Sequence, residues 1–398
     1  MSGQPSSFSP WPSFDEEQVN AVADVLRSGK VNYWTGEQGR RFESEYAEYV
    51  GCDHGIAVAN GTVALELALF AMGVGPGDEV ITTSRTFIAT ASCIVVRGAT
   101  PVFADVDESS QNLTVESIKK VVTDKTKAII AVHLAGWPCD VEALMSFAEE
   151  RNIKVIEDCA QAHGATLNGK QVGSMGHVAA FSFCQDKIIT TGGEGGMVTT
   201  NDKALWSKMW SYKDHGKSWD AVYRHDHPQG FRWLHDSFGT NWRMTEMQAV
   251  LGRHQLKQLA AWTKKRQFNA NRIWRAARKC QALRVPEVPD NIGHAAYKCY
   301  VFVRPEFLKP GWGRDRIMSE ISHQGVPCFS GSCSEVYLEK AFDGTEYGDV
   351  SDLPTAKALG ETSLMFLVHP TLTADEIEIS CEAIISVMEM ATKQTSLT

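Results

Sequence analysis

Apolar positions at helical spacing mark the first fifty residues of the chain. A capping-box pattern at Ser13 and Glu16 precedes apolar residues that recur every three or four positions until Gly29. This pattern predicts a first helix. A second predicted helix carries Phe42, among other aromatic residues, and stops at Gly51.

From residue 54 the pattern changes to short apolar runs that alternate with helical spacing. The runs predict strands at 56–58, 79–82, 101–104, 128–132, 154–156 and 178–183, and the helices between them fall near 62–72, 86–96, 114–122 and 141–151. Alternation of this kind predicts an α/β fold with a mostly parallel sheet covered on both faces. Ligands of such sheets bind beyond the carboxyl ends of the strands.

Residues 212–242 interrupt the alternation with a segment that has no periodicity. The segment is rich in tryptophan and histidine, including Trp219, Trp233, Trp242, His215, His225, His227 and His235. An aromatic segment of that length indicates a functional loop rather than disorder. Its histidines lack the spacing of metal ligands, and we expect no metal site.

A long helix is predicted over 243–280, and a smaller α+β domain follows it. That domain has a predicted strand at 299–303, a helix near 314–324 and a last helix opened by a capping box at Thr373 and Glu376. We therefore expect a large α/β domain at 1–250 and a small domain at 251–398.

Composition narrows the classes of partner. The chain has 398 residues, 43% of them hydrophobic, and a net charge of −9. An acidic chain is a poor ligand for nucleic acid. The ten cysteines are scattered without a C-x-x-C pair, which favours free thiols. No apolar run reaches the length of a membrane span and the N-terminus lacks an apolar leader, so we expect a soluble cytoplasmic protein.

The chemistry concentrates on Lys187, which stands just before a glycine-rich run, Gly192-Gly-Glu-Gly-Gly196. Asp158 ends a predicted strand about thirty residues upstream. Pyridoxal phosphate requires an amine for a Schiff base and a carboxylate that keeps its ring nitrogen protonated. A single lysine is more often a solvated surface charge, but glycines and apolar residues surround Lys187 in sequence. The pair therefore indicates pyridoxal phosphate.

Other candidate contacts follow successive strands. Gly61 and Thr62 stand where a strand meets a helix, a position that suits a phosphate; the alternative is an ordinary helix cap. Phe87 could stack on a flat ring, or pack in the core. Gln161 could bind the ring hydroxyl, and Ser182 could contact phosphate.

At this point the chain resembles a known family, the pyridoxal-phosphate sugar aminotransferases of the DegT/DnrJ/EryC1/StrS group, which have fold type I. The resemblance rests most strongly on three segments: Ile156-Glu-Asp-Cys-Ala-Gln-Ala-His-Gly164, Phe181-Ser-Phe with Lys187 and Gly192-Gly-Glu-Gly-Gly196, and Asn241-Trp-Arg-Met-Thr-Glu-Met-Gln248. It implies a seven-stranded large-domain sheet and a smaller C-terminal domain.

The resemblance also implies a role for each candidate. Lys187 would form the Schiff base, Asp158 would pair with the ring nitrogen and Gln161 with the ring hydroxyl. Phosphate would be held by Gly61, Thr62 and Ser182, while Phe87 would stack on the ring. Asn241 would reach the phosphate of the neighbouring subunit, so the resemblance implies a homodimer with shared sites. Trp34 and His215 are further candidates for substrate contact.

The implied activity is amino transfer, with L-glutamate as donor, to a keto group of a nucleotide-activated sugar, in the synthesis of aminosugars and surface glycans. Two alternatives remain open: the same transfer to a keto-cyclitol in antibiotic assembly, and a regulatory protein that keeps the fold without turnover. The chain departs from the family pattern over 325–337, where many relatives carry a histidine-containing loop beside the substrate. The sequence therefore leaves the sugar and the nucleotide open.

Overall fold

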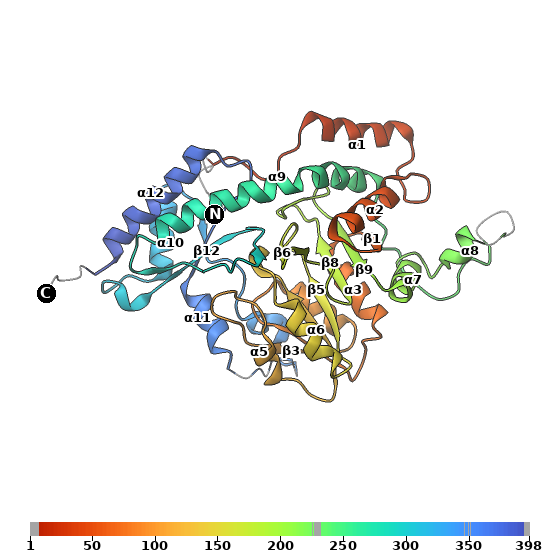
Figure 1. Cartoon of the computed structure of the whole chain (residues 1–398), viewed down its shortest axis with the longest axis horizontal. Helices are drawn as coiled ribbons and strands as arrows, with labels where there is room; N and C mark the ends of the chain where they lie inside the picture. The colour runs from red at the N-terminus through yellow and green to blue at the C-terminus, as the bar shows by residue number, and fades with distance from the viewer. Residues whose placement is uncertain are drawn as a thin grey trace.

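A seven-stranded sheet forms the centre of the computed structural model (Figure 1), which describes residues 8–224, 226, 232–345, 347–348, 350 and 352–393. The strand order is β1-β9-β8-β5-β4-β2-β3. The strands are β1 (His54–Val58), β2 (Glu79–Thr83), β3 (Thr100–Ala104), β4 (Thr126–Val132), β5 (Lys154–Asp158), β8 (Val178–Ser182) and β9 (Gly196–Thr200). The predicted α/β class and the mostly parallel seven-stranded sheet are confirmed.

The strand directions determine where the candidate residues meet. Strands β3, β2, β4, β5 and β8 are parallel neighbours, and β9 runs antiparallel to both β8 and β1. Strand β1 therefore has the same direction as β8. The carboxyl ends of β1, β2, β5 and β8 lie at one edge of the sheet, and the predicted cofactor residues of this chain follow these four ends.

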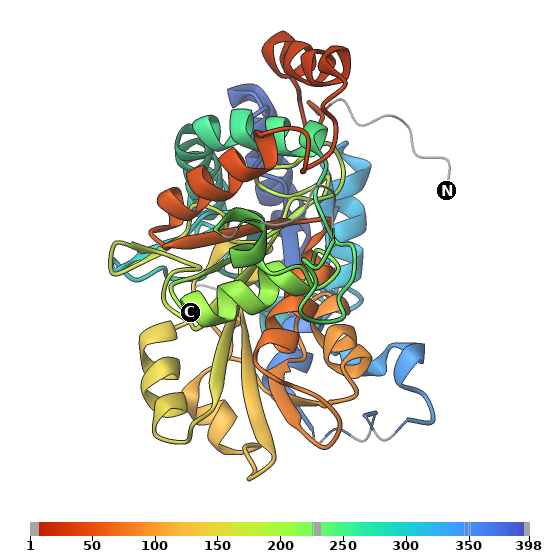
Figure 2. The same ribbon diagram turned by 90° about the vertical axis from the view of Figure 1, so that its right-hand side faces the viewer.

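Helices cover both faces of the sheet, as Figure 2 shows with α3 and α4 in orange on one side and α6 in yellow on the other. The side chains of β4 explain the arrangement: Ile130 packs with α3 and α4, whereas Ile129 packs with α5 and α6. The helices of this part are α1 (Glu16–Ser28), α2 (Gln38–Val50), α3 (Gly61–Ala71), α4 (Ala89–Val96), α5 (Val115–Lys119), α6 (Val141–Glu149), α7 (Lys203–Tyr212) and α8 (Trp219–Tyr223). Alternation along a strand thus buries both faces.

The first helix begins later than the sequence predicts. Asp15, not Ser13, is the N-cap of α1, and its carboxylate accepts a hydrogen bond from the Gln18 N–H at 2.8 Å. A carboxylate is also the favoured partner of the positive helix end. The helix leaves Val19 and Leu26, two of the apolar residues at helical spacing, exposed at 52% and 56%.

The long helix α9 (Glu246–Ala277) runs between the large sheet and the C-terminal part of the chain (Figure 1). Its first half packs with α2 and β8, and its second half packs with the C-terminal sheet. The expected domain boundary, between residues 250 and 251, falls inside this continuous helix. The division into domains at 1–250 and 251–398 remains a proposal.

The C-terminal part is α+β, as the sequence predicts. Its antiparallel sheet has the order β10-β12-β14-β13. Its elements are β10 (Leu283–Arg284), β12 (Cys299–Val303), β13 (Cys328–Phe329), β14 (Ser363–Phe366), α10 (Arg314–His323), α11 (Pro354–Thr362) and α12 (Ala374–Ala391). A third small sheet joins β11 (Ile292–Gly293), β6 (Thr166–Leu167) and β7 (Lys170–Gln171). Single 3-10 turns are η1 (Leu134–Gly136), η2 (Pro305–Phe307), η3 (Val336–Leu338) and η4 (Lys340–Phe342).

The aromatic segment between α7 and α9 is mostly irregular. It contains the short helix α8 and isolated bridges that join Asp214 to Asn241 and Lys217 to His235. His225 and His227, which the sequence pattern singled out, lie outside the described residues. Within the ranges that the structure describes, every helix is too short or too polar to cross a membrane.

Candidate active site

A cavity of about 640 Å³ lies at the carboxyl edge of the large sheet. Seven of the residues proposed from the sequence line it: Gly61, Thr62, Phe87, Asp158, Gln161, Ser182 and Lys187. The strand ends that carry these residues belong to β1, β2, β5 and β8. The edge predicted to bind a ligand is therefore the edge where the cavity lies.

One wall of the cavity is the N-terminus of α3. Asn60 caps this helix, because its side-chain oxygen accepts from the Val63 N–H at 3.0 Å. A Cβ at Gly61 would lie 2.6 Å from the Cβ of Ser182, so only glycine lets the helix and β8 approach this closely. Gly61, Thr62 and Ser182 thus line the cavity at the N-terminus of α3, a position that suits an anion.

Asp158, the last residue of β5, is 5% exposed. Its two carboxylate oxygens accept hydrogen bonds from the Thr90 hydroxyl at 3.0 Å and from the Ala160 N–H at 3.1 Å. Burial raises the pKa of the Asp158 carboxyl, and these hydrogen bonds lower it by less. A cationic N–H donor in the cavity would favour the ionised carboxylate.

Lys187 also lines the cavity, from a loop that follows β8. Its Nζ lies 3.3 Å from Oδ1 of Asp186 and 3.5 Å from the hydroxyl of Tyr297. The Tyr297 hydroxyl also donates to the second oxygen of Asp186. Burial raises the pKa of Asp186, but Lys187 and Tyr297 outweigh it, so the pKa lies below the ordinary value. The Lys187 side chain is half-buried. The backbone carbonyl oxygen of Lys187 accepts a hydrogen bond from the Trp11 indole N–H at 2.9 Å.

Phe87 and Gln161 also line the cavity. Phe87 is 69% exposed, so the alternative of core packing is wrong. Gln161 accepts through Oε1 from the Ala135 N–H at 2.9 Å. Since the oxygen is occupied, the amide nitrogen is the end that can donate to a ligand.

A buried histidine that we did not single out from the sequence supports the end of β8. His163 is fully buried between the Tyr46 hydroxyl, 2.7 Å from Nδ1, and the Ser182 carbonyl oxygen, 2.8 Å from Nε2. Burial lowers its pKa to about 3, so the ring is neutral, donates to Ser182 and accepts from Tyr46. This bond fixes the backbone that carries the Ser182 side chain.

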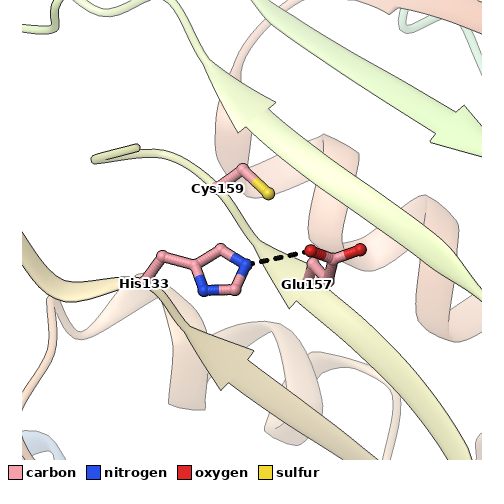
Figure 3. A group of neighbouring side chains, drawn as sticks. All are labelled: His133, Glu157 and Cys159. Atoms are coloured by element: carbon pink, nitrogen blue, oxygen red, sulfur yellow. Dashed lines mark hydrogen bonds and ion pairs between the residues drawn. The ribbon is translucent and has the colours of Figure 1, made fainter. Parts of the chain in front are cut away.

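On the opposite face of β5, His133, Glu157 and Cys159 form a second polar group (Figure 3). Glu157 accepts from His133 Nε2 at 3.1 Å and from the backbone N–H groups of residues 173, 175 and 176. The other His133 nitrogen accepts from the Cys139 N–H at 2.9 Å. Burial raises the pKa of Glu157, but His133 and the backbone donors outweigh it and the net shift is downward. Because hydrogen bonds occupy the His133 and Glu157 atoms, we interpret the group as a structural tie between β4, β5 and the loop before β8.

The three remaining predicted residues, Trp34, His215 and Asn241, do not line this cavity. They gather around Asp214, whose Oδ1 pairs with Arg243 at 2.6 Å and Lys217 at 3.2 Å. Lys217 lies 4.0 Å from the centre of a Trp34 ring, and Asn241 bridges to Asp214 itself. Asn241 does not cap α9, since Thr245 does so with a capping box to Gln248.

Sequence reasoning missed three groups that shape the cavity: Thr90, Asp186 and Tyr297. A signal existed for the first, because Thr86 and Thr90 stand one helical turn apart after β2 and their hydroxyls lie 2.9 Å from each other. Asp186 directly precedes Lys187. Tyr297 comes from a distant segment, and no local pattern links it to the lysine.

Comparisons with known proteins agree over nearly the full length. Residues 12–385 match the model of the DegT/DnrJ/EryC1/StrS aminotransferase family. The chain is 37% identical to UDP-N-acetyl-3-dehydro-alpha-D-glucosamine 3-aminotransferase of Acidithiobacillus ferrooxidans over 91% of each chain. It is 36% identical to GDP-perosamine synthase of Vibrio cholerae, covering 94% of this chain and 96% of that one. The solved aminotransferase from Psychrobacter cryohalolentis superposes with a TM-score of 0.95 at 60% identity, over 96% of this chain and 99% of that one.

Proposed function

Because this chain belongs to the DegT/DnrJ/EryC1/StrS aminotransferase family of pyridoxal-phosphate-dependent sugar aminotransferases, we propose that it moves an amino group from L-glutamate to a keto group of a nucleotide-activated sugar. The product would be an aminosugar for surface-glycan synthesis. The observation that carries the proposal is the cavity that joins the half-buried amine of Lys187 to the buried carboxylate of Asp158.

The residues present fit pyridoxal phosphate. A buried carboxylate with a raised pKa suits a protonated ring nitrogen, since the cation would supply the missing charge. The close approach of Gly61 to Ser182 leaves a cradle at a helix N-terminus, which suits the phosphate. Phe87, exposed on the cavity wall, suits the flat face of the ring.

When bound, pyridoxal phosphate supplies a conjugated ring that withdraws electrons from the carbon bearing the amine. Lys187 would hold it through Nζ, and the same nitrogen would serve as the base that takes the proton from the donor's α-carbon. Asp158 would hold the proton on the ring nitrogen, and the Gln161 amide would donate to the ring hydroxyl oxygen. Gly61, Thr62 and Ser182 would bind the phosphate.

The proposed function is tested by separating the two half-reactions. Mixed with L-glutamate alone, the enzyme should release 2-oxoglutarate in an amount equal to its cofactor content. The aminated enzyme should then transfer the amine to a ketosugar from a panel whose members carry either UDP or GDP. Mass spectrometry detects the aminated product. Two results would contradict the proposal. In the first, the enzyme aminates a keto-cyclitol but none of the ketosugars. In the second, it aminates no acceptor, whether the donor is L-glutamate or another amino acid.

We also propose a homodimer with shared sites. Asn241, Trp34 and His215 form one group outside the chain's own cavity, as expected for residues that serve a neighbouring subunit. Large apolar side chains nearby are exposed, Trp233 at 84% and Phe238 at 99%. Exposed aromatic residues of this size favour a covering partner, and a second copy of the chain is the partner that a shared site requires.

A mixing test separates this proposal from a site formed within one chain. Lys187→Ala and Asn241→Ala proteins are each expected to be impaired, and exchange of their subunits should restore activity. A mixed dimer has one site with both changes and one site with neither, so equal mixing should recover roughly a quarter of wild-type activity. If Asn241 serves its own chain, every site keeps one change and nothing is recovered; a monomer by sedimentation would also contradict the proposal.

A further inference from the structure

A second cavity, of about 940 Å³, opens beside the first one. The two cavities share four lining residues, Asp186, Tyr297, Lys298 and Gly331. The rest of the second wall comes from residues 8–11, from α9, from α10 and from the segments 327–330 and 365–369. A molecule that reacts at Lys187 could therefore extend into this cavity past Tyr297.

Arg266 of α9 lines the second cavity and is 2% exposed. Its Nη1 donates to the Tyr297 carbonyl oxygen at 3.3 Å. Its Nε and Nη2 have no hydrogen-bond partner among the described residues. These two nitrogens form one side of the guanidinium, from which two parallel hydrogen bonds can be donated to the two oxygens of a carboxylate. A buried guanidinium without such an acceptor is costly, which indicates a ligand rather than a purely structural role.

The charges around Arg266 favour an anion. Asp186, the acidic residue in the wall, already holds Lys187 and accepts from Tyr297. Lys298 adds a second positive charge. Burial lowers the pKa of His369 to about 4, so that ring is neutral near pH 7. Burial also lowers the pKa of Arg266 to about 9, and this group remains a cation there.

We propose that Arg266 binds the side-chain carboxylate of a dicarboxylic amino donor, and thereby selects the donor for the proposed amino transfer, on which this inference rests. Tyr297 sets the spacing. Its hydroxyl lies 3.5 Å from Lys187 Nζ, whereas its carbonyl oxygen lies 3.3 Å from Arg266. The length of a tyrosine thus separates the two cations. A carboxylate directly bonded to the amine-bearing carbon is too close to that carbon to reach Arg266, but the side-chain carboxylate of glutamate is farther along the molecule.

The N-terminal segment 8–11 covers this carboxylate site. The Arg266 guanidinium carbon lies 5.0 Å from the centre of the Trp11 ring, and Thr371 donates to the Pro10 carbonyl oxygen at 2.8 Å. Both unpaired nitrogens are closed to solvent in this arrangement. The donor can therefore enter only when the segments that wall the cavity shift. Its carboxylate would then form a bidentate pair with these two nitrogens.

The test compares donors in the first half-reaction by stopped-flow absorbance. For Arg266→Gln, we expect kcat/KM with L-glutamate to fall roughly ten- to a hundredfold, the range for loss of charge-assisted hydrogen bonds, while the rate with L-alanine changes by less than about threefold. Arg266→Lys keeps the charge without the fork and should lose glutamate selectivity by a smaller factor. The matched control is Arg272→Gln on the same helix, whose partner Glu378 is at the surface; it should change neither rate.

Equal losses with both donors, or no change with either, would overturn the inference. Calorimetric titration of succinate, a dicarboxylate without an amine, provides a second measurement that does not need turnover. Wild-type enzyme should bind succinate and Arg266→Gln should bind it at least about tenfold more weakly. If no amino acid reacts but this binding difference appears, the proposed function fails and the carboxylate site stands; if L-glutamate reacts and succinate binds both proteins equally, the carboxylate site fails alone.

Discussion

Replacing Lys187 with alanine is expected to abolish amino transfer while leaving the protein folded and able to bind pyridoxal phosphate without a covalent bond. The variant removes both the anchoring amine and the base that would move the donor's α-proton. General-base and covalent contributions of this kind are each worth several orders of magnitude, so the rate should fall by about a thousandfold or more. Rapid-quench measurement of 2-oxoglutarate formation from L-glutamate checks the loss.

A matched control is Lys170→Ala, which removes an exposed lysine paired with Glu142 at 3.1 Å. Its rate and melting temperature should equal those of the wild type. The Lys187 variant should retain the phosphate contacts, so the cofactor should remain bound after gel filtration at saturating concentration. A Lys187→Ala protein that transfers amine at a rate near wild type would contradict the assignment.

Replacing Asp158 with asparagine is expected to produce the second-largest effect. Asparagine keeps the shape and one oxygen acceptor but removes the charge that would hold the ring nitrogen protonated. The loss of one charge-assisted hydrogen bond should cost about 2–4 kcal/mol of transition-state stabilisation, or roughly tens to a thousandfold in rate. Single-turnover kinetics at saturating cofactor measures this effect apart from cofactor affinity.

The asparagine variant also distinguishes a chemical role from a structural one. Asp158 accepts from Thr90 and Ala160, and an asparagine oxygen can keep one of these bonds. If Asp158 only organised these neighbours, the variant would react at a near wild-type rate with an unchanged melting temperature. Under the proposed role the melting temperature stays similar, whereas the rate falls and the visible spectrum of the bound cofactor changes because its ring nitrogen loses a proton.

The sequence predicts the sheet and the cavity well because both depend on local pattern. Apolar runs between helices locate six of the seven strands of the large sheet, and parallel strand ends bring Asp158, Ser182 and Lys187 to one edge. Strand β9 (Gly196–Thr200) was not predicted, since it begins at the last glycine of the glycine-rich run and has only two large apolar residues, Met197 and Val198. Its antiparallel pairing with β1 and β8 is a long-range contact that local spacing does not encode.

The parts that the sequence does not predict depend on contacts between distant segments. Tyr297 reaches Asp186 and Lys187 from more than a hundred positions away, and Trp11 reaches the Lys187 carbonyl from the N-terminal segment. The exposed Val19 and Leu26 show the same limit, because helical spacing finds an apolar face without showing what covers it. Neither side chain is buried within the single chain, and the homodimer proposed above offers a surface that could cover them.

Borohydride reduction followed by peptide mapping shows whether Lys187 carries the cofactor. Reduction of the wild-type enzyme with bound pyridoxal phosphate makes the lysine–cofactor bond permanent, and tandem mass spectrometry then locates the added mass. We predict a single labelled peptide with the modification on Lys187, and no label when the Lys187→Ala protein is treated in the same way. A label on another lysine, or an unlabelled wild-type protein that nevertheless transfers amine, would show that Lys187 does not hold the cofactor.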